Sequence, residues 1–70
     1  MLQAEKDWDK AIWYNNKGYR LNPDDYSWPL SIGHLYQAKG YKKSALDYFN
    51  QVLRLNPDNK DAQSAIVSLR

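Results

Sequence analysis

The stretch RLNPD occupies residues 20–24, and the same five residues return in the same order at residues 54–58. A chain of 70 residues therefore contains one motif twice, at an offset of 34. When residues 1–25 are compared with residues 35–59 at this offset, ten of the 25 pairs are identical. A fixed period between about 20 and 50 residues is the mark of stacked structural units.

In each copy the motif follows a segment with helical periodicity. The stretches SALDYFNQVLRL (44–55) and DKAIWYNNKGYRL (9–21) carry apolar residues at spacings of three and four, which predicts one apolar face on each helix. Asn22-Pro23 and Asn56-Pro57 then end these helices, because the residue before proline is disfavoured in the α region. The expected apolar faces are Ala45, Tyr48, Phe49, Val52, Leu53 and Leu55 in the later helix, and Ala11, Ile12, Tyr14, Tyr19 and Leu21 in the earlier one.

The segment SWPLSIGHLYQAKG (27–40) lies between the two stops and predicts a further helix. Ser27 is the expected N-cap, and Pro29 is tolerated because it falls in the first turn. Gly40 is the expected left-handed stop. The apolar stripe of this helix comprises Leu30, Ile32, Leu35 and Tyr36.

A last helix is expected after Pro57, with Asp58 or Asn59 as its cap. The predicted helices cover residues 8–21, 27–39, 43–55 and 60–69. The buried side of the last helix is expected to be Ala62, Ala65, Ile66 and Leu69. Residues 2–5 align with the end of the helix at 27–39, so we expect the chain to begin in the last turn of an earlier helix.

The 34-residue period resembles the tetratricopeptide repeat, a helix–turn–helix unit that stacks into a superhelix. The residues that carry the resemblance are Gly33, Tyr36, Gly40, Ala45, Phe49 and Pro57. In the unit that precedes them Asn15 stands in the aromatic position, and Lys6 in the position of the turn glycine. The resemblance implies an all-α fold of antiparallel helix–turn–helix repeats. It divides a single domain (1–70) into a partial repeat (1–25), a full repeat (26–59) and a C-terminal capping helix (60–70).

Composition and charge limit the classes of function that the sequence supports. The chain is 43% hydrophobic and 26% charged, which is typical of a globular domain, and its formal net charge is only +2. That balance does not indicate a nucleic-acid or membrane partner. There is no cysteine, no apolar run long enough to span a bilayer and no signal-peptide pattern, so we expect a soluble protein.

Motifs for chemistry are lacking. His34 is the one histidine, and no carboxylate stands at a spacing that would support catalysis or metal binding. Asp58, Asn59 and Asp61 are placed as helix caps rather than as a calcium loop. No serine lies in a G-x-S-x-G motif, and the glycines are too scattered for a phosphate loop. We therefore expect no catalytic residue, no cofactor and no metal, and a protein that is not an enzyme.

The resemblance implies a binding face on the first helix of each unit. The implied positions are Ser27, Leu30, His34, Gln37 and Ala38, followed by Asp61, Ser64 and Ser68. The carboxylate clamp of some relatives is not expected, because Leu30 and Ser64 stand in its lysine positions and His34 in an asparagine position. The prediction is a non-catalytic module that binds a peptide or protein surface.

An alternative role rests on the aromatic residues near the start of the chain. Trp28 is interpreted as a packing residue, whereas Trp13 fits either packing or an interface, since Trp and Tyr are favoured as interface anchors. The alternative is an oligomerisation or packing element with Trp8, Ile12 and Trp13 at the contact. It would form a homodimer or the C-terminal tail of a larger bacterial enzyme, since the layout resembles the short repeat tail of some bacterial serine hydrolases.

Overall fold

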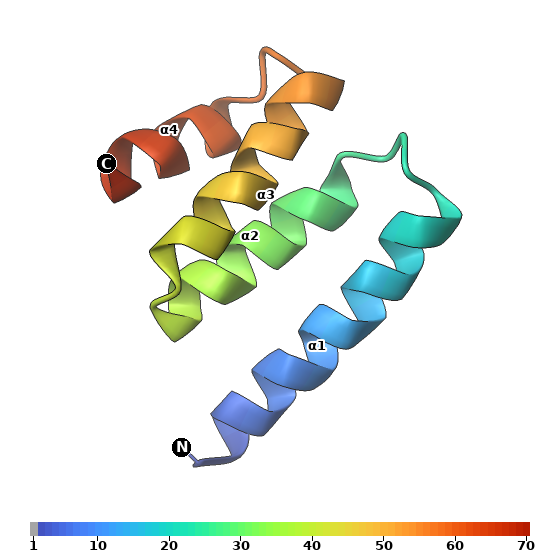
Figure 1. Cartoon of the computed structure of the whole chain (residues 1–70), viewed down its shortest axis with the longest axis vertical. Coiled ribbons are helices and arrows are strands. Elements are labelled where there is room, and N and C mark those ends of the chain that lie inside the picture. Colours follow the sequence, from blue (N-terminus) through green and yellow to red (C-terminus); the bar gives the residue numbers. More distant parts are fainter. Residues whose placement is uncertain (1) are drawn as a thin grey trace.

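The computed structural model describes residues 2–70, with side chains placed for residues 7–70. Its four helices are α1 (Leu2–Leu21), α2 (Ser27–Lys39), α3 (Lys42–Leu55) and α4 (Lys60–Leu69), and the described residues form no strand. α2 packs against α1 and α3, and α4 packs against α3. Figure 1 shows α1 and α3 running in the same direction, with α2 antiparallel to both. The all-α prediction is confirmed.

The turn between α2 and α3 forms as the sequence indicates. Gly40 adopts φ 87° and ψ 13°, the left-handed conformation that glycine takes without a Cβ penalty. Its N–H donates to the carbonyl of Gln37 at 3.0 Å, and the N–H of Tyr41 donates to the carbonyl of Tyr36 at 2.9 Å. This pair of bonds is a Schellman motif, which satisfies the last carbonyls of α2 and reverses the chain.

The core lies where α2, α3 and α4 meet. The largest side chains with no exposed surface are Phe49, Ile32, Val52 and Pro29. Phe49 fits because Gly33 has no side chain: a Cβ at Gly33 would lie 2.8 Å from Phe49 Cε1. Ala62 and Ala65 complete the cluster from α4. The absence of a side chain at Gly33 thus leaves the space on α2 that the ring of Phe49 fills.

Three tyrosines extend the packing toward α1. The rings of Tyr36 and Tyr41 stack at 6.0 Å, and those of Tyr36 and Tyr48 at 5.7 Å. Tyr48 then donates from its hydroxyl to Asn16 Oδ1 on α1 at 3.3 Å. Partial burial of this hydroxyl raises the pKa of Tyr48. The stack thus uses three of the ten aromatic residues of the chain for packing.

The start of the chain differs from the prediction. α1 runs without a break from Leu2 to Leu21, so residues 2–5 belong to the same helix as residues 8–21 and are not the end of an earlier one. The reason lies in Lys6, which stands where the other unit has Gly40. Without a glycine no residue there adopts the left-handed stop cheaply, and Leu2, Ala4 and Glu5 favour helix.

The predicted apolar face of α1 is also only partly correct. Ile12 is 7% exposed, but Tyr14 is 61% and Leu21 73% exposed. Tyr14 and Leu21 are seven residues apart, so they lie on one side of the helix. That side faces away from α2. Apolar periodicity therefore identified the helix but not which of its faces is buried.

Trp28 is a packing residue, as predicted. Its indole ring lies on Gly18 of α1, where an added Cβ would come within 2.6 Å of the ring. This contact fixes the start of α2 against the end of α1. The bulk of Trp28 thus replaces the side chain that Gly18 lacks.

Candidate functional site

The predicted binding residues of α2 form one stripe along the helix. Ser27, Leu30, His34 and Gln37 are three or four residues apart, and this spacing places them on the same side. His34 is exposed, as are Ser27 and Ala38, whereas Leu30 and Gln37 are half-buried. Leu30 packs against the core cluster, so only part of its side chain is available to a ligand.

His34 is held from beneath by the core. Its imidazole ring meets Phe49 edge to face, with 5.1 Å between ring centroids and 75° between ring planes. Contacts of this kind orient a ring at little entropic cost. The exposed edge of His34 therefore presents nitrogen donors and acceptors at a fixed place on the surface.

Ser27 does not act as the N-cap that the sequence indicated. It is the first residue of α2, and its backbone N–H donates to Asp25 Oδ1 at 3.0 Å. Its hydroxyl donates to the same oxygen. Both bonds favour the charged carboxylate and lower the pKa of Asp25. Asp25 thus supplies the acceptor for the N–H of the first residue of α2, while the N-cap residue Tyr26 makes no side-chain bond there.

The predicted residues of α4 lie on its exposed side. Ser64, like Asp61 and Ser68, is exposed, while Ala62 is fully buried. Asn59 caps the helix, with Oδ1 accepting from the N–H of Ala62 at 2.9 Å, which confirms one of the two caps that the sequence offered. Ser64 corresponds to Leu30 at the 34-residue offset. The described hydrogen bonds do not connect Ser64 with the stripe on α2.

The three residues of the alternative interface have different surroundings. Ile12 is buried within the chain, so it is not available to a partner in the folded state. Trp8 is half-buried. Trp13 is 59% exposed, and its ring meets Tyr14 edge to face at 5.1 Å. Only Trp8 and Trp13 therefore offer surface for such a contact.

Three lysines lie near the α2–α3 turn, and they have different surroundings. Lys39 forms an ion pair with Asp9 of α1, and this hydrogen bond raises the pKa of Lys39. Its Nζ also lies 5.1 Å from the ring centroid of Tyr41. Lys42 and Lys43 are exposed. Lys39 thus ties the end of α2 to α1.

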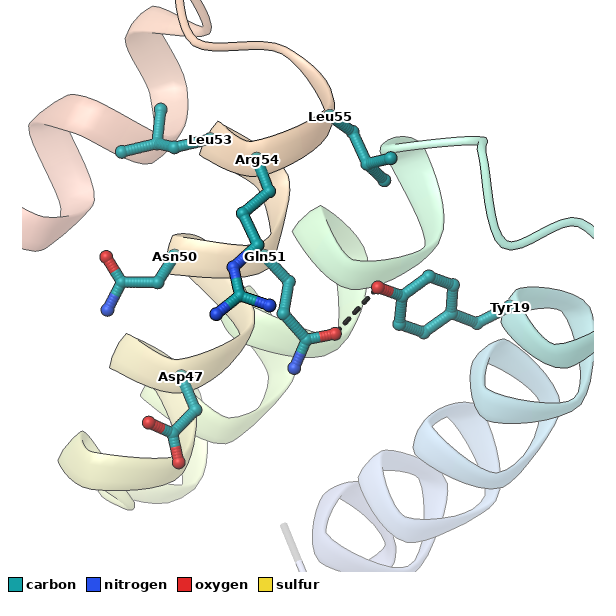
Figure 2. A pocket seen from close by; sticks show the side chains of 7 residues that line it. All are labelled: Tyr19, Asp47, Asn50, Gln51, Leu53, Arg54 and Leu55. Carbon is teal, nitrogen blue, oxygen red and sulfur yellow. Dashed lines mark hydrogen bonds between the residues drawn. The ribbon is translucent and has the colours of Figure 1, made fainter.

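Sequence reasoning missed the hollows between α1 and α3. One pocket of about 750 Å³ is lined by Tyr19 of α1 and by α3, and a second of about 510 Å³ is lined mainly by α1 and by Tyr48. Figure 2 shows the first, with Gln51 reaching from α3 to the hydroxyl of Tyr19 and Arg54 extending along α3. The sequence does place the polar residues Asp47, Asn50 and Arg54 at helical spacing along α3. That spacing is equally typical of a helix face exposed to solvent, so it did not predict a pocket.

Within residues 7–70, no group of three or more histidine, aspartate or glutamate side chains could hold a metal ion. None of the helices in the described part of the chain is long and apolar enough to cross a membrane.

A comparison with protein families decides the nature of the central unit. Residues 30–59 match the family described as tetratricopeptide repeat. The chain carries a tetratricopeptide repeat. The match runs from Leu30 on α2, through α3, to Asn59 at the cap of α4. A search of curated proteins gave no match.

The tetratricopeptide repeat explains the arrangement of the helices. Gly33, Gly40, Phe49 and Pro57 all lie inside the matched segment and have the close contact, turn, core position and helix stop that the repeat requires. Tetratricopeptide repeats are generally protein–protein interaction units, and the family is typically a non-catalytic scaffold. α1 and α4 flank the matched unit and pack on its two helices.

Proposed function

We propose that the chain is a non-catalytic interaction module that binds a peptide or protein surface through the exposed stripe of α2, continued by Ser64 on α4. The observation that supports this most strongly is His34, an exposed ring held edge to face on the buried Phe49. A fixed polar group beside half-buried Leu30 offers both specificity and apolar contact. Ser27 and Ala38 have small side chains, so they leave room at the two ends of the stripe for the backbone of a bound peptide.

The division of the chain into a partial repeat (1–25), a full repeat (26–59) and a capping helix (60–70) fits this role. At the 34-residue offset α4 corresponds to α2, with Ser64 in place of Leu30 and Ser68 in place of His34. A ligand that crosses both helices would meet a small, polar surface on α4. Selectivity then rests on α2, where the larger side chains stand.

The test uses a random peptide library displayed on phage to obtain a binding peptide of known sequence. The double variant His34→Glu with Ser64→Glu is expected to weaken the binding of that peptide by about tenfold or more, since it places two charges at exposed positions of the stripe. Both residues are exposed, so helicity should persist, and circular dichroism checks it. Lys43→Gln, which also makes the chain more negative but lies on α3, is the control. Unchanged affinity in the double variant would refute the proposed face.

A second candidate role is self-association through exposed aromatic residues of α1. The supporting observation is the exposed pair of Trp13 and Tyr14, an aromatic patch on the part of α1 that faces away from α2. Aromatic pairs of this kind are common interface anchors. In this role the chain would form a homodimer or pack against a larger bacterial enzyme of which it is the C-terminal tail.

Trp13→Glu separates this candidate from the first. If the patch is an oligomer contact, light scattering after size exclusion will give at least twice the chain mass for the wild type at high concentration and the chain mass for the variant. Helicity should be equal in both, because Trp13 is mostly exposed. A wild type that keeps the mass of one chain over about a hundredfold range of concentration would eliminate homodimerisation.

A further inference from the structure

The α1–α3 groove is a surface distinct from the stripe on α2. We use this name for the two pockets of about 750 and 510 Å³ that open between α1 and α3. Two hydrogen bonds cross it: Tyr19 donates to Gln51 Oε1 at 2.6 Å, and Tyr48 donates to Asn16 Oδ1 at 3.3 Å. The first is drawn in Figure 2. These bonds join parallel helices at positions one turn apart, so the groove follows the two helices lengthwise.

The charges along the α1–α3 groove are mostly positive. Lys17 and Arg20 line it from α1, and Arg54 lines it from α3, against the single carboxylate of Asp47. All three cations are exposed, and none has a carboxylate within 4.0 Å among the residues whose side chains are described. Their charge is therefore available to an external anion.

An aromatic side chain stands beside these cations. Trp13 lines the smaller pocket and is 59% exposed. The ammonium of Lys17 lies 5.4 Å from the centroid of its ring, a cation–π distance that favours one position for the lysine. Tyr48 forms part of the opposite wall, where it is half-buried and held by Asn16. The groove thus combines apolar contact area with pre-positioned positive charge.

We propose that the α1–α3 groove binds an acidic peptide segment of another protein. In the bound state, Asp or Glu carboxylates of that segment pair with Lys17, Arg20 and Arg54, and an apolar side chain rests on Trp13. Arginine pairs with carboxylates through two parallel hydrogen bonds, which gives specificity over a simple point charge. A nucleic acid fits this groove less well. Nucleic-acid binding usually needs many contacts between cations and phosphates, and the groove has three cations and one carboxylate.

The arginines also have a structural role that the test must separate. Arg20 lies in the last turn of α1 and Arg54 in the last turn of α3. A cation in the last turn stabilises a helix through its interaction with the helix dipole. That role predicts an effect on helix stability alone. Peptide binding predicts an effect on ligand affinity in a protein that is still folded.

The experiment follows amide shifts in heteronuclear NMR as acetyl-hexaglutamate-amide is added to the whole chain in about 50 mM salt. We expect saturable shifts along residues 13–20 of α1 and 47–55 of α3, with a dissociation constant of about 1 mM or tighter. Acetyl-hexaglutamine-amide should leave these shifts unchanged. The double variant Arg20→Glu with Arg54→Glu should lose at least about tenfold in affinity.

Lys43→Glu with Lys60→Glu is the matched control, because it makes the same change in net charge at two exposed positions that line neither pocket. It should keep the affinity of the wild type to within a factor of about two. Equal losses in both double variants, or equal shifts with the glutamine peptide, would overturn the proposal. So would tighter binding of oligothymidylate to the same residues, or shifts there that depend on protein concentration and report a second copy of the chain. These outcomes are independent of the test of the α2 stripe.

Discussion

Replacement of Phe49 with alanine is expected to leave most of the chain unfolded at room temperature. Phe49 has no exposed surface and belongs to the core cluster shared by α3 and α4, while its ring also lies on Gly33 of α2. Loss of a buried phenylalanine costs about 3–5 kcal/mol. A domain of this size rarely has more than about 3–5 kcal/mol of unfolding free energy in total.

The measurement is a urea titration followed by circular dichroism, for the wild type and for Phe49→Ala. The variant should begin the titration with most of its helical signal already lost. Tyr14→Ala is the control, because it also removes an aromatic ring but at a site that is 61% exposed. We expect the control to change the free energy of unfolding by about 0.5 kcal/mol or less. A Phe49→Ala protein as stable as the control would show that the core is not where the structure places it.

Gly33→Val is expected to lower the free energy of unfolding by about 1–3 kcal/mol, the usual cost of overpacking. A Cβ at Gly33 would lie 2.8–3.0 Å from three atoms of the Phe49 ring, which is fully buried and has no room to move. Helix propensity alone would give a small effect of the opposite sign, since valine is a better helix former than glycine. The sign of the change therefore identifies the contact.

A double-mutant cycle that combines Gly33→Val with Phe49→Leu measures the contact between the two residues directly. Leucine removes part of the volume that the valine needs, so the two changes together should cost less than the sum of their separate effects, by about 1 kcal/mol. Chemical denaturation of the four proteins gives the coupling energy. Ala38→Val, at an exposed site on the same helix, should cost only about 0.5 kcal/mol through helix propensity and should not couple with Phe49→Leu. Additive effects of Gly33→Val and Phe49→Leu would contradict the close contact.

The bounds of α2 and α4 could be predicted from sequence because each has its own local signals. Tyr41 and Gly40 at the end of α2, and Asn59 at the start of α4, set these bounds by hydrogen bonds within a few residues. The beginning of α1 could not be predicted by the 34-residue comparison, because Lys6 replaces the glycine on which the comparison depended. Sequence identity at Gln3 and Ala4 does not preserve a turn when the turn residue itself has changed.

Which faces are buried was harder to predict than where the helices lie. Tyr14 is identical to Tyr48 at the repeat offset, yet Tyr48 is half-buried in a stack and Tyr14 is exposed. The difference arises because Tyr48 stacks on Tyr36 of α2 and bonds to Asn16 of α1, whereas Tyr14 meets Trp13 of its own helix. The α1–α3 groove was missed for a related reason. It depends on Tyr19 and Tyr48 reaching across to another helix, and spacing along one helix carries no information on such contacts.

The candidate site on α2 could be predicted in outline, since the resemblance named the residues and the structure places most of them on one side of the helix. It could not be predicted that Ser27 is engaged by Asp25 or that Leu30 belongs partly to the core. Both facts move the expected ligand contacts toward His34 and Ala38. They also explain why His34 and Ser64, rather than Leu30, are the positions to change in a binding test.

We propose that this tetratricopeptide repeat binds a protein ligand on the stripe of α2 and on Ser64 of α4. The most direct test is to add a library-selected peptide to the isotopically labelled chain and to map the amides whose NMR signals shift. We expect saturable shifts centred on His34 and Ala38 and extending to Ser64, with the amides along residues 13–20 of α1 unchanged. Shifts confined to α1 and α3, with His34 and Ser64 unaffected, would contradict it.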